Sequence, residues 1–83
     1  PETVVNEGSK DHDFRVESNG NANMLFVDGG NDHVNIGTST DLGGTLNVSG
    51  SGVFQVSDNS DTLKLVSTDD DANVGPVLRS CIQ

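Results

Sequence analysis

The chain has 83 residues and a formal net charge of −9, with 13 acidic residues against 4 basic ones. This balance argues against binding to nucleic acid, whose phosphates need Lys and Arg for neutralisation, and against binding to anionic membrane surfaces. Hydrophobic residues make up only 31% of the chain, and a single cysteine excludes an intrachain disulfide. So small an apolar content gives a lone chain a poor core, and we expect stabilisation by oligomerisation or metal binding.

The first half of the chain predicts short β-strands at residues 3–5, 14–17, 24–27 and 34–36. Phe14 and Val16 alternate with Arg15, which is typical of a strand with one buried face. Residues 24–27 are all apolar, so we expect that strand to be covered on both faces. Asn19-Gly20 predicts a tight hairpin turn, and the Gly-rich run at 28–32 predicts a second turn.

The second half predicts strands at residues 45–48, 53–56 and 62–66, joined by polar turns. An apolar-polar-apolar step followed by a serine recurs at residues 46–50, 54–58 and 63–67, which suggests similar strands stacked along an axis. We expect the apolar members of each step to point one way, with Asn47 and Lys64 pointing the other way. A charged turn at 69–71 precedes Pro76, which suits the first residue of another strand.

The sequence therefore predicts an all-β fold of short strands and tight turns. Such strands bury too little individually, so we expect three copies to intertwine into an elongated β-prism-like or β-helix-like fibre segment. We expect residues 1–83 to be one segment of a longer fibre protein, with a first β-module at 1–37 and a second, truncated β-module at 45–83. The predicted trimer core consists of Phe14, Val16, Met24, Phe26, Val34, Ile36, Leu46, Val48, Phe54, Val56, Leu63 and Leu65.

Two segments of the sequence resemble the tail-fibre-like virion proteins of tailed bacteriophages. Such proteins are frequent in marine phages. The first runs from Phe14 to Ser39 and includes Val34-Asn35-Ile36-Gly37-Thr38, where Asn35 replaces the glycine usual in that family. The second covers residues 63–73 and 75–78. The resemblance implies a homotrimeric β-structure on the virion, attached to the tail and used for host adsorption. It implies other tail or capsid proteins as partners, and a host glycan or protein bound through another part of the chain. A capsid or neck fibre is the alternative within this class.

Asp and Asn clusters leave a calcium-stabilised β-roll surface adhesin as an alternative of another class. The clusters lie at residues 28–32, 58–61 and 69–71, but each also suits ordinary turns, and no EF-hand loop is present. His12 and His33 lack the pairing of a transition-metal site. We therefore predict no metal and no cofactor.

We also predict that the chain is not an enzyme. It has no Gly-x-Ser-x-Gly nucleophile elbow, and Gly50-Ser51-Gly52 suits a turn between strands. Cys81 lies in the last three residues, without the neighbourhood that activates a catalytic thiol. Polysaccharide-cleaving tailspikes use paired carboxylates in a long parallel β-helix, which this chain is too short to build alone.

Overall fold

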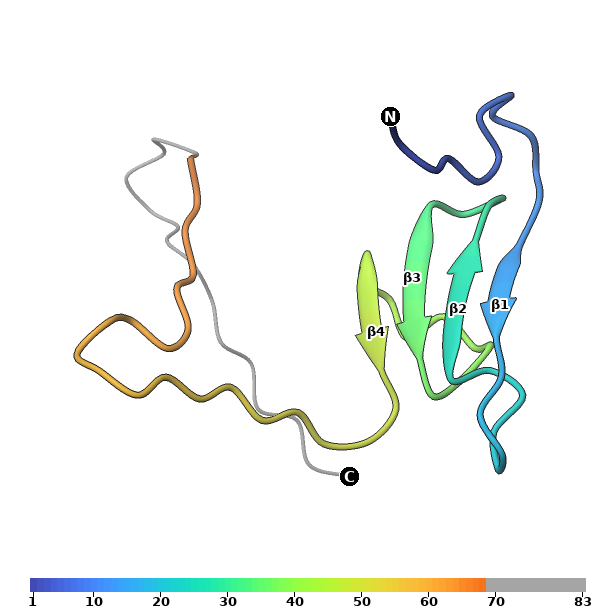
Figure 1. Ribbon diagram of the computed structural model, residues 1–83. Coiled ribbons are helices and arrows are strands. Elements are labelled where there is room, and N and C mark those ends of the chain that lie inside the picture. The colour runs from blue at the N-terminus through green and yellow to red at the C-terminus, as the bar shows by residue number, and fades with distance from the viewer. Residues whose placement is uncertain (69–83) are drawn as a thin grey trace. The chain divides into compact units, whose positions relative to one another are not determined.

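The computed structural model describes residues 1–68, which contain four short strands and no helix (Figure 1). The prediction of a β-rich segment is confirmed by these residues. The predicted charged turn at 69–71 and the predicted strand after Pro76 lie outside the described part of the chain. The strands are β1 (Phe14–Val16), β2 (Leu25–Asp28), β3 (His33–Ile36) and β4 (Leu46–Val48).

The four strands form one mixed sheet in the order β1-β2-β3-β4. The pairs β1–β2 and β2–β3 are antiparallel, whereas β3 and β4 run parallel. Neighbours in the sheet are thus neighbours in the chain, so every backbone connection is local. The strand β4 belongs to the residues that sequence analysis assigned to the second module, and it pairs with β3.

The connection between β1 and β2 spans residues 17–24 and differs from the tight Asn-Gly hairpin that the sequence predicted. Neither Asn19 nor Gly20 has the positive φ that such a turn requires. Ser18 and Asn21 nevertheless close a turn over Asn19-Gly20 within this connection: the Ser18 backbone N–H donates to the Asn21 carbonyl at 2.9 Å, and the Ser18 hydroxyl accepts from the Asn21 N–H at 3.1 Å. The turn therefore lies where the sequence predicts it, but the Ser18 side chain helps to close it and it has no positive φ.

The connection between β2 and β3 is the tight turn that the sequence predicted at residues 28–32. Asp28 pairs with His33 across the strands, and its carbonyl accepts a hydrogen bond from the Asp32 N–H at 3.0 Å. One carboxylate oxygen of Asp28 accepts from the N–H groups of Gly30 and Asn31 at 3.1 and 3.2 Å. Asp32 closes the turn at φ 59°. The Asp28 side chain therefore stabilises this turn by accepting hydrogen bonds from the backbone that follows it.

The parallel pair β3–β4 is joined by residues 37–45, a short connection for two parallel neighbours. Gly37 begins it at φ 85°, a conformation that favours glycine, and its N–H donates to the carbonyls of Asn23 and Met24 at 3.1 Å. The Val34 N–H donates to the Thr45 carbonyl at 2.8 Å, and the Ser49 N–H to the Ile36 carbonyl at 2.9 Å. These bonds hold Val34-Asn35-Ile36 and Leu46-Asn47-Val48 side by side in register.

The chain divides into two compact units, Pro1–Gly52 and Val53–Gln83. Three predicted strands, at residues 3–5, 53–56 and 62–66, are corrected by the structure, which contains no strand there. Each of these segments lacks a neighbouring strand in the described single chain, and a strand exists only through pairing. In the second unit, Asp58 forms the expected turn by accepting from the Ser60 N–H at 2.9 Å and the Ser60 hydroxyl at 2.6 Å.

Candidate functional site: an uncovered apolar face

In each of the three strand pairings, every two apolar residues that pair directly lie on the same face of the sheet. Directly paired residues project from the same side of a sheet, and successive residues alternate. Phe14 pairs with Val27, Val27 with Val34, and Val34 with Leu46, and the pairs two residues away continue the pattern. We name this surface the apolar face, and its members are Phe14, Val16, Leu25, Val27, Val34, Ile36, Leu46 and Val48.

The apolar face is only partly covered in the single chain: its members on the inner strands β2 and β3 are half-buried, and its members on the outer strands β1 and β4 are exposed. No hydrophobic residue among residues 1–68 is buried, and Leu46 on the edge strand is 64% exposed. Fully burying one side chain of this kind contributes about 1.5–3 kcal/mol, and the single chain obtains only part of this contribution from the eight side chains. Contiguous exposed apolar surface is typical of interaction sites, which makes the apolar face the candidate functional site.

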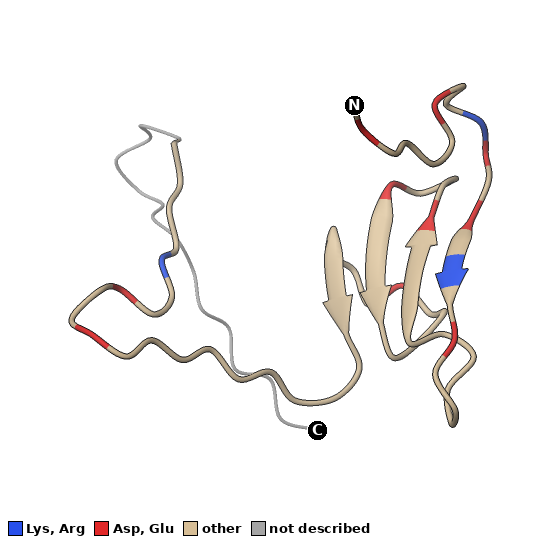
Figure 2. Ribbon diagram, viewed as in Figure 1, with Lys and Arg blue, Asp and Glu red and all other residues tan. Residues whose placement is uncertain are grey.

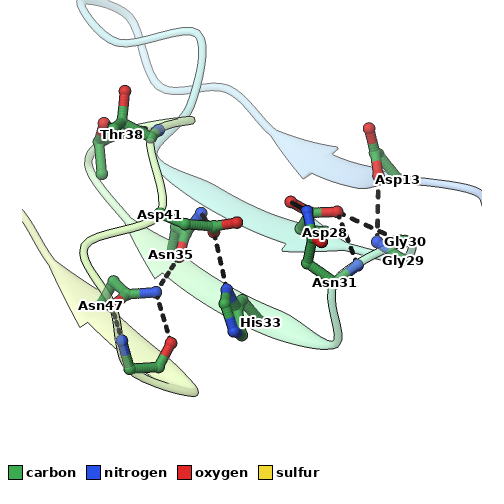
Figure 3. A network of polar contacts seen from close by, with 12 residues as sticks. Asp13, Asp28, Gly29, Gly30, Asn31, His33, Asn35, Thr38, Asp41 and Asn47 are labelled. Carbon is green, nitrogen blue, oxygen red and sulfur yellow. Dashed lines mark hydrogen bonds and ion pairs between the residues drawn. The ribbon is translucent and has the colours of Figure 1, made fainter.

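The opposite face carries a buried polar network in place of a hydrophobic core (Figure 3). Asn35 is fully buried and Asn47 is 4% exposed, and the two occupy the same position on the paired strands β3 and β4. The Asn47 side-chain N–H donates to Asn35 Oδ1 at 2.7 Å and to the Gly44 carbonyl at 2.9 Å. Asn47 Oδ1 accepts from the Gly44 N–H at 2.8 Å. The two amides therefore fasten the loop before β4 to the sheet.

Asp41 extends the network across the same loop. Its Oδ1 accepts from the Asn35 side-chain N–H at 2.9 Å and lies 3.0 Å from Nδ1 of His33, close enough for an ion pair when the imidazole is protonated. That imidazole nitrogen is buried and makes no hydrogen bond besides this contact. The Asn35 hydrogen bond, with His33 next, lowers the pKa of Asp41 below its usual value. The ionised carboxylate thus stabilises the loop.

The structure places half of the predicted trimer core together on the apolar face. Six of the twelve predicted residues lie on the apolar face. Phe26 lies on the opposite face, since it pairs with Arg15 and Asn35. Met24 precedes β2, and the remaining four predicted residues belong to the second unit: Phe54, Val56, Leu63 and Leu65.

Sequence reasoning missed Leu25 and Val27. The run from Met24 to Val27 has no alternation, so it does not reveal which residues share a face. The turn length would have settled the matter: pairing Asp28 with His33 across the turn places Val27 opposite Val34.

Charge is concentrated away from the strands (Figure 2). Among the residues of the four strands, Arg15 and Asp28 are the only Lys, Arg, Asp or Glu residues, and both project from the face opposite the apolar face. Arg15 lies 3.4 Å from Glu17 in an exposed ion pair, which contributes little to stability. The apolar face is therefore free of charge despite the strongly acidic composition, so copies of the chain can approach it without a direct charge clash.

Within residues 1–68, the Asp clusters stabilise turns through side-chain hydrogen bonds. Asp28 accepts hydrogen bonds within its own turn, and Asp58 does so with Ser60. Among residues 1–68, no group of three His, Cys, Asp or Glu side chains is placed to hold a metal ion. Within the same residues, no helix has the length and hydropathy of a membrane span. The Asp cluster at 69–71 and Cys81 lie outside the described part of the chain.

No protein-family model, curated protein or solved structure matches this chain.

Proposed function

We propose that this chain is a structural and adhesive component of a bacteriophage virion, forming a shaft or attachment segment of a homotrimeric tail fibre. The observation that carries the proposal is the apolar face, a surface of eight apolar side chains in a segment without a buried hydrophobic residue among residues 1–68. The two segments that resemble phage tail-fibre-like proteins supply the virion and the host adsorption role. A capsid or neck fibre is the second location for the same assembly.

Association of copies through the apolar face supports this function physically. Each copy presents the same face, and most soluble oligomers are closed symmetric assemblies of identical chains. A threefold arrangement directs three apolar faces toward a common axis and leaves the charged turns outside. Burial at the axis replaces the core that the single chain lacks, as is common for small segments.

The solution mass of the purified chain, measured by light scattering with and without a calcium chelator, tests this proposal. We expect a folded trimer whose mass and circular dichroism do not change on chelation. A folded monomer would overturn the trimeric fibre. Unfolding on chelation would instead favour the calcium-stabilised β-roll adhesin. Labelled antibodies against the chain, applied to virus particles that carry it, would then distinguish a tail fibre from a capsid or neck fibre.

A further inference from the structure

The sheet has two open edges, formed by β1 on one side and β4 on the other (Figure 1). Among residues 1–68, neither strand has a neighbouring strand on its outer side. Each edge therefore presents backbone N–H and C=O groups that no strand in this part of the chain pairs with. An open edge of this kind is a surface to which a strand of another chain can add.

The hydrogen bonds between β4 and β3 show which backbone groups of β4 point outward. The Thr45 carbonyl accepts from the Val34 N–H, and the Ser49 N–H donates to the Ile36 carbonyl, so both groups point toward β3. The backbone groups of successive residues in a strand point to opposite edges. The N–H and C=O groups of residues 46 and 48 therefore point away from β3, where a further strand could pair with them.

The two open edges match each other in length, pattern and direction. β1 and β4 each have three residues, with a polar residue between two apolar ones. The two antiparallel pairings and one parallel pairing of the sheet leave β1 and β4 running in the same direction. A copy that is rotated about an axis along the strands keeps that direction, so its β1 can lie parallel to β4 of the first copy.

The apolar residues of the sheet form two rows that cross all four strands. The rows are Phe14, Val27, Val34 and Leu46, and Val16, Leu25, Ile36 and Val48. With Phe14 of a second copy beside Leu46, and its Val16 beside Val48, both rows continue into the next copy without a break. Arg15 is the only charged residue of β1 and β4, so such a contact brings no like charges together.

The width of the sheet fits a ring of three copies. Four strands about 4.8 Å apart make a side of roughly 19 Å, and a triangle of three such sides has its centre about 5.5 Å from the middle of each side. Sheets that pack face to face lie about 10 Å apart, so the side chains of each sheet fill about 5 Å. Three sheets joined edge to edge would therefore bring their apolar faces into contact at the axis.

We propose that the β4 edge of each copy binds the β1 edge of the next copy in parallel, so that three sheets close into a triangular prism with the apolar faces inside. The inference rests on the proposed trimer and gives it a specific contact between strands, with Phe14 beside Leu46 and Val16 beside Val48. Closure of the ring leaves neither edge open, which prevents the addition of further chains along the sheet.

The test is disulfide trapping in the full chain with Val16→Cys and Val48→Cys combined, and with Cys81→Ser to remove the natural thiol. Within one copy, β1 and β4 are three strand spacings apart, about 14 Å, which is too far for a disulfide. We expect oxidised glutathione to convert the monomer band into a covalent trimer on a non-reducing gel. The control combines Val16→Cys with Leu46→Cys, which shifts the register by about 7 Å, and should give little covalent trimer.

The light-scattering mass of the natural chain separates this inference from the proposed assembly. A trimer in solution that yields no covalent trimer, or yields it equally with both cysteine pairs, would contradict the edge contact alone. Covalent dimers without trimers would contradict closure by three copies. A natural chain that is monomeric would contradict both the trimeric fibre and the edge contact.

Val48→Pro gives a second measurement that needs no cysteine. Proline removes the outward N–H of this edge residue, which a single sheet tolerates, whereas the edge contact loses a hydrogen bond and meets the ring. Val48→Ala is the control, because it also removes apolar surface but keeps the N–H. We expect the trimer of Val48→Pro to dissociate at a concentration about tenfold or more above that of Val48→Ala. Equal dissociation of the two variants would overturn the edge contact.

Discussion

The two faces of the sheet differ in chemistry and in burial, and the difference runs opposite to that of most soluble sheets. One face is apolar and only partly covered, whereas the other is polar and contains the fully buried Asn35 and the almost buried Asn47. Hydrogen bonds in a buried amide network fix geometry but add little net stability, whereas apolar burial stabilises most folds. The polar face therefore helps to define the arrangement of β3 and β4, and we propose that the apolar face stabilises an assembly.

The sharpest way to test this difference is Leu46→Asp on the apolar face. Leu46 is 64% exposed in the single chain, so a chain that acts as a monomer would tolerate a carboxylate there with little loss. If three apolar faces meet, the charge is buried without a partner, and we expect a loss of about 3–5 kcal/mol per chain together with dissociation of the trimer. Light scattering and urea unfolding measure the two effects.

The matched control is Ser39→Asp, which adds the same charge in an exposed loop residue. We expect this variant to remain a trimer of unchanged stability. Equal, small effects of both substitutions would show that the apolar face stays in contact with water.

On the polar face, Asn47→Leu is expected to give the next largest effect. The substitution removes the partner of Asn35 Oδ1 and of both backbone groups of Gly44. Gly44 is exposed, so water can replace its two bonds, whereas Oδ1 of the fully buried Asn35 is left without a partner. A buried polar group without a partner costs about 1–3 kcal/mol, and we expect a loss of that size in the free energy of unfolding. Asn59→Leu, at an exposed residue of the second unit, is the control and should leave stability almost unchanged.

Because Leu is apolar, Asn47→Leu separates the two roles proposed for the faces. A more stable protein would mean that the amide network is replaceable by apolar packing and does not set the β3–β4 register. A less stable protein that still forms trimers would confirm that geometry and assembly depend on different faces.

The sequence predicted all four strands of the sheet. β1, β3 and β4 were found because each shows an apolar-polar-apolar step, β2 was found from its run of apolar residues, and the Gly-rich turn at 28–32 was found from its Asp and Gly residues. Residues 53–56 show the same step, yet no strand forms there in the described single chain. Local pattern gives the capacity to form a strand, whereas pairing depends on a partner that one sequence does not reveal.

The polar network was hidden for a related reason. Sequence analysis placed Asn47 on the side away from the apolar residues, which is correct, and treated Asn35 as a substitution for a family glycine. It did not predict that the two amides bond to each other, because that depends on β3 and β4 running parallel in register. An asparagine repeated at the centre of two apolar steps is the signal that could have indicated it.

A third prediction concerns the N-terminal segment, which the hydrogen bond from the Gly29 N–H to Asp13 Oδ1 joins to the β2–β3 turn. In Gly29→Ala the new Cβ would clash with the His12 backbone, so we expect the N-terminal segment to move, with a loss of about 1–3 kcal/mol in the free energy of unfolding. Gly20→Ala is the control, because Gly20 has open space around its Cα and no positive φ. Thermal unfolding of both variants measures the effect. Equal stability would mean that the segment is not held against the turn.

The smallest expected effect is the pH dependence that Asp41 gives to the polar face. The pKa of its carboxyl is lowered in the folded chain by the Asn35 hydrogen bond and by His33, so folding favours the ionised form. The resulting stabilisation is present above the unfolded pKa of roughly 3.9 and is lost as the pH falls through the lower folded pKa. Asp41→Asn should therefore be less stable than the natural chain at neutral pH.

That stability difference should shrink as the solution is acidified below about pH 4, because the natural carboxyl then becomes protonated as well. Urea unfolding at a series of pH values measures it. Asp61→Asn serves as the control, since the Asp61 side chain makes no hydrogen bond or ion pair within residues 1–68. A difference between Asp41→Asn and the natural chain that stays constant with pH would show that Asp41 holds the loop by shape alone. The apolar face contains no ionisable group, so this pH dependence reports on the polar face only.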